Sequence, residues 1–128
     1  MITVKQAATA YRKMNATSLP PLTAVCQALA AIDEKLDEAH HYLEQSDEQW
    51  RDGLLKAQQL IFELMAMTNA TSIEGERLLT LYIYANQTLV TSSLKADASG
   101  ILEVQSIVRS LHADWQHAQK KQVLTPYI

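Results

Sequence analysis

The stretch from Leu78 to Leu94 reads LLTLYIYANQTLVTSSL, and its apolar residues cover more of a helix than one packed face requires. At about 100° per residue, one apolar stripe contains Leu78, Tyr82, Ala85 and Leu89. A second stripe contains Leu79, Ile83, Val90 and Leu94. With Leu81 included, the apolar arc spans roughly 220°, whereas packing one face of a bundle helix needs about 100°. We therefore predict a bundle helix whose second stripe is covered by something outside its own core.

The composition of the chain favours an all-helical fold. Its 128 residues are 48% hydrophobic, and they include only three Gly and three Pro. No Pro lies between Leu22 and Thr125, so long helices can form without interruption. Runs of alternating β-branched residues, which are typical of strands, are missing. We predict an all-α protein in which residues 1–128 form a single helical-bundle domain.

Capping signals divide the chain into helices joined by short connections. The predicted helices cover residues 22–45, 47–68, 73–95 and 98–121. The residues expected to begin them are, in order, Pro20-Pro21, Ser46 with Gln49, Thr71 or Ser72 with Glu74, and Asp97. Residues 1–20 are expected to form a mobile amino-terminal segment, and residues 122–128 a tail. Because short connections make neighbouring helices antiparallel, we predict an up-down-up-down four-helix bundle.

Only the predicted helices 47–68 and 73–95 carry surplus apolar residues, beyond the single stripe that faces the core. Antiparallel neighbours bring such outer stripes close together, so we expect an apolar groove that binds a segment of a partner protein. The residues expected to bind this partner are Leu55, Phe62, Ala66, Leu79, Ile83, Val90 and Leu94.

The pattern leaves two other ways of covering this surface. Broad apolar faces on bundle helices often form homodimers, so a self-associating structural or interaction bundle is the first alternative. The second is self-covering, in which the amino-terminal segment around Tyr11 and Met14 lies over the groove.

Charge and hydropathy exclude several other partners. The net charge is −3 and there is no basic run, so we expect no nucleic-acid binding. No apolar run approaches the roughly 20 residues of a membrane span, and the first residues lack the apolar core of a signal peptide. We therefore expect no membrane insertion and a cytoplasmic location. The single cysteine, Cys26, excludes an internal disulfide and is typical of a reducing compartment.

No residue pattern predicts catalysis. Glu38 and His41 have the Glu-x-x-His spacing of di-iron bundles, and Asp114 and His117 form a weaker version. Such a site also needs inward carboxylates from the other two helices, where Leu, Met and Tyr are expected instead. A di-metal carboxylate bundle is thus the less favoured alternative. We expect that the protein is not an enzyme and that it has no catalytic residue, no cofactor and no metal ligand.

Four motifs, in order along the chain, resemble the flagellar export chaperones of the FliS family. They are Ala10-Tyr11-Arg12 followed by Pro21, KAQQLIFEL at Lys56–Leu64, LLTLYIY at Leu78–Tyr84 with Leu89, and Leu111-His-Ala-Asp-Trp115. Departures from the family's pattern mark a divergent member. In the helices, Ala30-Ala31 replaces Asp-Gly, Ala85 replaces Met, and Gln87-Thr88 replaces a basic pair. In the turn before the last helix, Lys95-Ala-Asp-Ala98 replaces the usual Asn/Asp-Pro form.

The resemblance implies a cytoplasmic chaperone that binds the carboxy-terminal segment of flagellin. It would prevent premature polymerisation and assist export through the flagellar type III apparatus. In this family the client occupies apolar grooves, and the amino-terminal segment can cover part of that surface when no client is bound. Tyr11 is therefore expected to act as a groove cover that competes with the client. Other flagellar export or regulatory proteins, and a second copy of the chain, are further partners that we consider.

Overall fold

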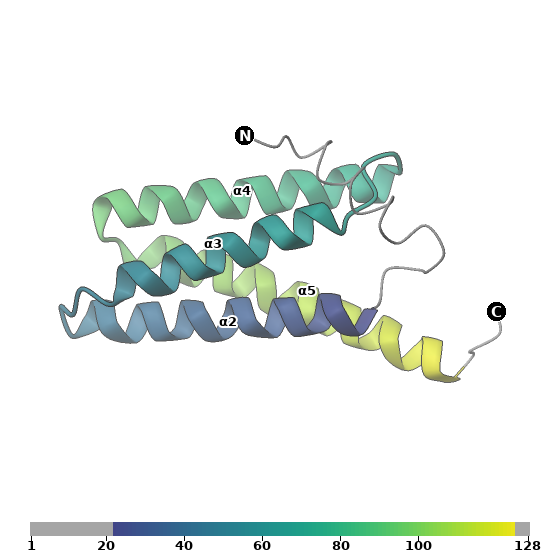
Figure 1. Ribbon diagram of the computed structural model, residues 1–128, viewed down its shortest axis with the longest axis horizontal. Coiled ribbons are helices and arrows are strands. Elements are labelled where there is room, and N and C mark those ends of the chain that lie inside the picture. The colour runs from purple at the N-terminus through teal and green to yellow at the C-terminus, as the bar shows by residue number, and fades with distance from the viewer. Residues whose placement is uncertain (1–21, 125–128) are drawn as a thin grey trace.

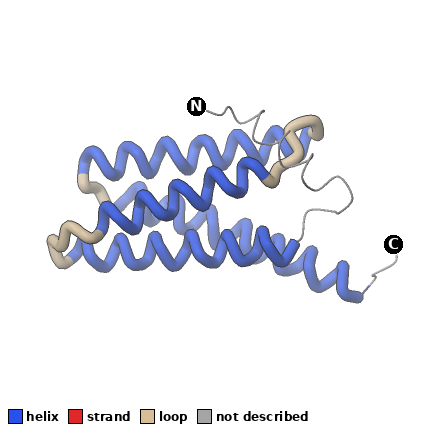
Figure 2. The backbone as a smooth tube through the Cα atoms, in the orientation of Figure 1, coloured by secondary structure: helices blue, strands red, loops and turns tan. Residues whose placement is uncertain are grey.

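The computed structural model describes the backbone of residues 22–124 and the side chains of residues 22–120. This part of the chain contains helices and no strand (Figures 1 and 2). The helices are α2 (Leu22–Glu44), α3 (Trp50–Ala66), α4 (Ile73–Lys95) and α5 (Ala98–Leu124). The predicted all-α fold is confirmed. The segment 1–20, with Tyr11 and Pro20, lies outside the described residues.

The helices form one antiparallel bundle in which each helix packs against two others. α2 contacts α3 and α5, and α4 contacts the same two helices from the opposite side. Successive helices run in opposite directions (Figure 1), so the predicted up-down-up-down arrangement is confirmed. Packing is uneven, because α2 contacts its neighbours much more extensively than α4 does. α4 is therefore packed less closely against its two neighbours than α2 is.

The core is built from one apolar stripe of each helix. Its largest fully buried side chains are Leu29, Ile32, Leu36, Leu54, Ile61, Leu64, Leu89, Ile101 and Val104. Burying a large apolar side chain stabilises the fold by roughly 1.5–3 kcal/mol, so these residues decide which face of each helix turns inward.

The connection between α2 and α3 corrects one predicted cap. Ser46 has a φ of 56°, and its N–H donates to the carbonyl of Leu43 while the N–H of Asp47 donates to that of Tyr42. These two bonds are the usual way to end a helix through a left-handed residue. Ser46 therefore ends α2 and cannot also be the extended residue that begins α3. The helix begins at Trp50 rather than at residue 47, and it ends at Ala66 rather than at 68.

The caps predicted for the last two helices are confirmed. The Ser72 hydroxyl accepts a hydrogen bond from the N–H of Gly75 at 2.9 Å, which identifies Ser72 rather than Thr71 as the cap of α4. Asp97 accepts one from the N–H of Ser99 at 2.9 Å at the start of α5. α5 continues to Leu124. Residues 122–124, predicted to belong to the tail, are therefore helical.

Candidate partner-binding groove

Large apolar side chains are exposed on the outer faces of α3 and α4. They include Leu55, Phe62, Ile83, Val90 and Leu94, all of which were predicted to bind a partner. Half of the surface of Phe62 is accessible, as is 46% of Val90 and 38% of Ile83. Ala66, also predicted, is half-buried. Single exposed apolar residues are common in proteins, so their arrangement matters more than their number.

Leu79 does not belong to this surface, which corrects its predicted place. It is 7% exposed and lies in the core with Tyr82 and Leu89, while Leu78 is only half-buried. The inward face of α4 is thus rotated toward residue 79 at the start of the helix. Adjacent leucines differ by about 100° around a helix, and only the packing against α3 and α5 decides which of them turns inward.

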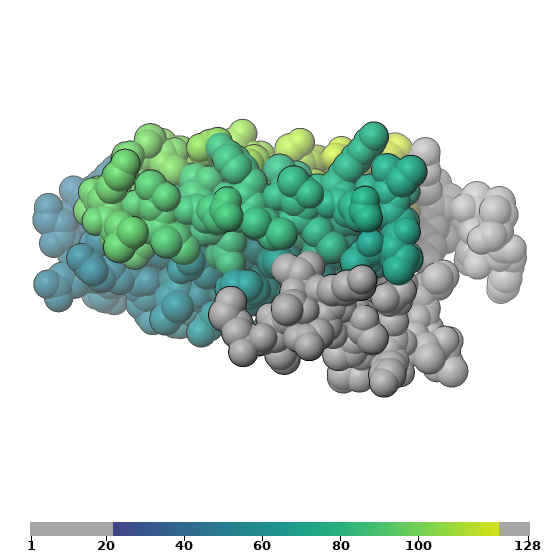
Figure 3. Space-filling view, turned by 90° about the horizontal axis from the view of Figure 1, so that it is seen from above, coloured from purple at the N-terminus to yellow at the C-terminus, as the bar shows by residue number. Residues whose placement is uncertain are grey.

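A cleft of about 500 Å³ brings together three of the predicted residues. Its lining residues come from α3 and α4, and they are Phe62, Met65, Ile83, Asn86, Gln87, Val90 and Thr91. In the face shown in Figure 3, α4 extends along the molecule in green. Leu55 and Leu94 do not line this cleft. They lie near the start of α3 and the end of α4, which an antiparallel pair places at the same end of the bundle.

The chemistry of the cleft suits apolar side chains. None of its lining residues is charged, and most of its exposed lining is apolar. Burying apolar surface of a partner here would be favourable by about 25 cal/mol for each Å² removed from water. A charged substrate would find no counter-charge among the lining residues. The lining therefore suits apolar side chains better than a charged ligand.

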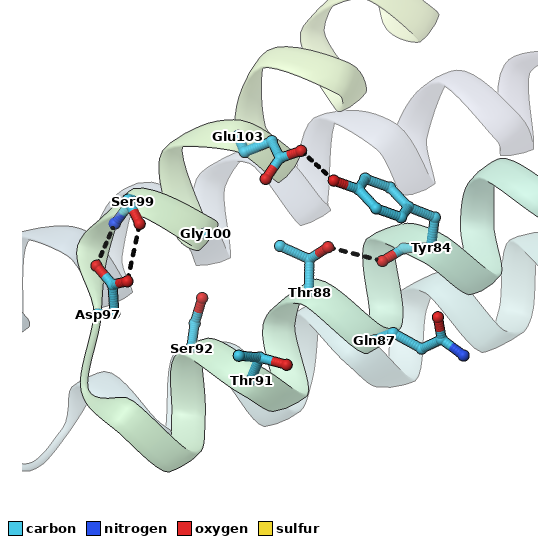
Figure 4. A pocket seen from close by; sticks show the side chains of 9 residues that line it. All are labelled: Tyr84, Gln87, Thr88, Thr91, Ser92, Asp97, Ser99, Gly100 and Glu103. Carbon is cyan, nitrogen blue, oxygen red and sulfur yellow. Dashed lines mark hydrogen bonds between the residues drawn. The ribbon is translucent and has the colours of Figure 1, made fainter.

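A second groove, lined mostly by residues with polar side chains and here called the polar groove, lies on the other side of α4. It has a volume of about 350 Å³ and is lined by Tyr84, Gln87, Thr88, Thr91, Ser92, Asp97, Ser99, Gly100 and Glu103 (Figure 4). The Tyr84 hydroxyl donates a hydrogen bond across it to the Glu103 carboxylate, and this bond raises the pKa of Tyr84. Sequence reasoning missed this groove because Gln, Thr and Ser on a helix are typical of a solvated face.

The two grooves share Gln87 and Thr91, which line both of them. α4 therefore forms a common wall, with the mainly apolar cleft toward α3 on one side and the polar groove toward α5 on the other. No pattern in the sequence predicts this sharing, because it depends on how far each neighbouring helix stands from α4.

The histidines that suggested a metal site have other surroundings. His41 is exposed and makes an edge-type ring contact with Tyr42, and His117 is also exposed. In the part of the chain that the structure describes, no group of three or more His, Cys, Asp or Glu side chains is placed to hold a metal ion. Among the described residues, no helix is long and apolar enough to cross a membrane.

Comparisons with known proteins give one finding that bears on identity. The model of the family described as "Flagellar protein FliS" matches residues 4–122 of this chain. The matched range contains all four motifs named above, from Ala10 to Trp115. The searches of curated proteins and of solved structures give no match.

Proposed function

This chain belongs to the FliS family of flagellar export chaperones, and we propose that its client is flagellin, bound through its carboxy-terminal segment. The groove between α3 and α4 holds that segment, prevents premature polymerisation and keeps the subunit ready for export. The protein acts in the cytoplasm and without catalysis. Family membership supports the chaperone role in general, and the exposed groove supports the choice of surface.

The observation that carries this proposal is the grouping of Phe62, Ile83 and Val90 around one uncharged cleft. Apolar residues gathered at a cleft mark a binding site far more specifically than the same residues scattered over a surface. One wall of the cleft is α4, which packs less closely against its neighbours than α2 does. A client segment with apolar residues at helical or alternating spacing can bury them between the two helices.

We further propose that the segment containing Tyr11 covers this groove when no client is bound. Tyr11 lies outside the described residues but within the range that the family model matches. A cover of this kind would shield Phe62 and its neighbours from water in the free protein. It would also lower the apparent affinity for the client, because the client must displace it.

A charge placed in the groove tests the proposal. Ile83→Asp should abolish co-purification of flagellin, because a carboxylate buried against Phe62 and Val90 has no counter-charge there. The measurement is a pull-down with purified flagellin, together with circular dichroism to confirm that the variant remains helical.

Leu102→Asp is the matched control, because Leu102 is an exposed apolar residue of α5 outside both grooves. It should bind flagellin as the unmodified protein does. Full binding by Ile83→Asp would show that the groove is not the client site. Equal loss in both variants would show that the effect of the charge is not specific to the groove.

A further inference from the structure

The side chain of Asn86 combines burial with an unfilled hydrogen-bonding capacity. It lies on α4 and lines the cleft together with Phe62, Ile83 and Val90. Its amide oxygen Oδ1 is buried, and no described residue donates a hydrogen bond to it. Within residues 22–120, it is the single buried side-chain nitrogen or oxygen atom in this condition.

An unpaired buried oxygen is costly, so it requires an explanation. The great majority of buried polar groups have a hydrogen-bond partner, and leaving one unpaired carries the full cost of removing it from water. The surroundings explain why none is present here. The residues of α3 that line the cleft are Phe62 and Met65, whose side chains have no hydrogen-bond donor. On α4 itself, Gln87 and Thr91 also line the cleft, and neither donates a hydrogen bond to Oδ1.

We propose that the Asn86 amide turns toward the cleft when a client segment enters, and that Oδ1 then accepts a hydrogen bond from a backbone N–H of that segment. This inference rests on the proposed function, because it concerns the same cleft. The apolar walls hold the client's side chains, and Asn86 provides the polar contact that fixes the register of its backbone. Asn86 is thus a specificity-determining residue in a site that otherwise selects only for apolar character.

The contact restricts the conformation of the client at one point. Backbone N–H groups in the interior of a helix are already paired within the helix. A free N–H therefore exists only where the client is extended or within the first turn of a helix. Proline cannot occupy the contacting position, because it has no N–H. The client segment that passes Asn86 is accordingly an extended stretch or a helix start, flanked by apolar residues.

The first experiment compares two amide-to-leucine substitutions, one inside the cleft and one outside it. The probe is a synthetic peptide with the carboxy-terminal sequence of the same organism's flagellin, titrated by fluorescence anisotropy. Asn86→Leu should weaken binding about tenfold or more, because the peptide N–H loses its acceptor. Its thermal midpoint should rise or stay unchanged, since an unpaired buried oxygen is removed. Gln116→Leu, at an exposed position of α5 that lines neither groove, should bind within about twofold of the unmodified protein.

The second experiment locates the contact on the peptide. Single N-methylation at each successive position removes one N–H at a time. At one position, methylation should weaken binding to the unmodified protein but should not weaken binding to Asn86→Leu further, as a double-mutant cycle requires. Asn86→Ala, which also lacks the acceptor and favours helix, provides the same comparison if the leucine variant folds poorly.

The outcomes separate this inference from the proposed function. If the unmodified protein does not bind the peptide, the proposed function fails and the inference fails with it. If the unmodified protein binds but Asn86→Leu and Asn86→Ala bind equally well, only the role of Asn86 is overturned. That role is also overturned if both variants bind weakly but no N-methylated position is coupled to Asn86.

Discussion

Gly75 shows how a single residue fixes the connection between α3 and α4. A Cβ atom built at this position would lie 1.6 Å from the carbonyl oxygen of Asn69 and 2.8 Å from Oγ of Ser72. The first is a backbone atom, and the second is the cap that accepts the N–H of Gly75 itself. Neither can move away without loss of the turn. The connection therefore depends on the absence of a side chain, not on an unusual backbone angle.

We expect Gly75→Ala to lower the free energy of unfolding by about 2 kcal/mol, because the clash outweighs the better helix propensity of alanine. Urea denaturation followed by circular dichroism measures the change. Gly53→Ala is the comparison. Its Cβ would lie 3.0 Å from the carbonyl oxygen of Lys35 and 3.1 Å from Cβ of Ala39, so only a small shift of α2 is needed. A Gly75→Ala protein as stable as the unmodified one would show that the turn adapts easily.

At the residue scale, the sequence predicted the kind of site better than its exact members. Phe62, Ile83 and Val90 are exposed in one cleft, as the outer stripes of two helices predicted. Leu79 is buried instead, because a periodic pattern cannot distinguish between two adjacent leucines. The unpaired amide oxygen of Asn86 was not predicted, since it depends on which hydrogen-bond donors surround this residue after folding.

At the scale of elements, the ends of the helices depend on residues in left-handed backbone conformations. Ala96, with a φ of 51°, ends α4, and the N–H of Asp97 then donates to the carbonyl of Ser92 at 3.1 Å. This conformation costs a residue with a Cβ roughly 1–2 kcal/mol, whereas glycine adopts it freely. This strained conformation at Ala96 ends α4 and allows α5 to begin two residues later, at Ala98.

Ala96→Gly should therefore raise the free energy of unfolding by about 1 kcal/mol. Ala113→Gly makes the same chemical change at an exposed position inside α5, and there it should lower that free energy by about 1 kcal/mol. Thermal and urea unfolding of the two variants side by side measure the difference. The idea is contradicted if both substitutions change stability in the same direction.

The sequence predicted a helix boundary correctly where the capping residue can only begin a helix. It failed where the same residue can either begin one helix or end the previous one. The side chains of Ser72 and Asp97 accept hydrogen bonds from N–H groups in the first turns of α4 and α5, as predicted. Ser46 has the same capping chemistry in the sequence, but the structure uses it to end α2. A serine can take either role, and the backbone conformation that Ser46 adopts in the folded turn decides which one it takes.

At the scale of the whole molecule, the bundle is held more firmly on one side than on the other. Gln105 of α5 is 4% exposed, and its Nε2 donates to Asp33 at 2.8 Å and to Asp37 at 3.3 Å on α2. Nε of Arg109 lies 3.0 Å from the same Asp33 carboxylate. These contacts join residues far apart in the sequence, so helical periodicity could not predict them. They fix α2 against α5, on the side of the bundle away from the groove.

The exposed groove between α3 and α4 also bears on the oligomeric state of the free protein. If the groove serves a client, the isolated protein should sediment as a monomer at micromolar concentration, and Ile83→Asp should leave its sedimentation coefficient unchanged. A dimer that dissociates in Ile83→Asp but persists in Leu102→Asp would instead identify the groove as a homodimer interface. Sedimentation velocity over a hundredfold concentration range measures this.

The shared wall between the two grooves has a mechanical consequence. Gln87 and Thr91 line the cleft toward α3 and the groove toward α5 at once. If α4 moves sideways as a rigid rod, one groove narrows by about the distance that the other widens. In such a motion the two surfaces change width together, so that a ligand that widens one groove by displacing α4 also narrows the other.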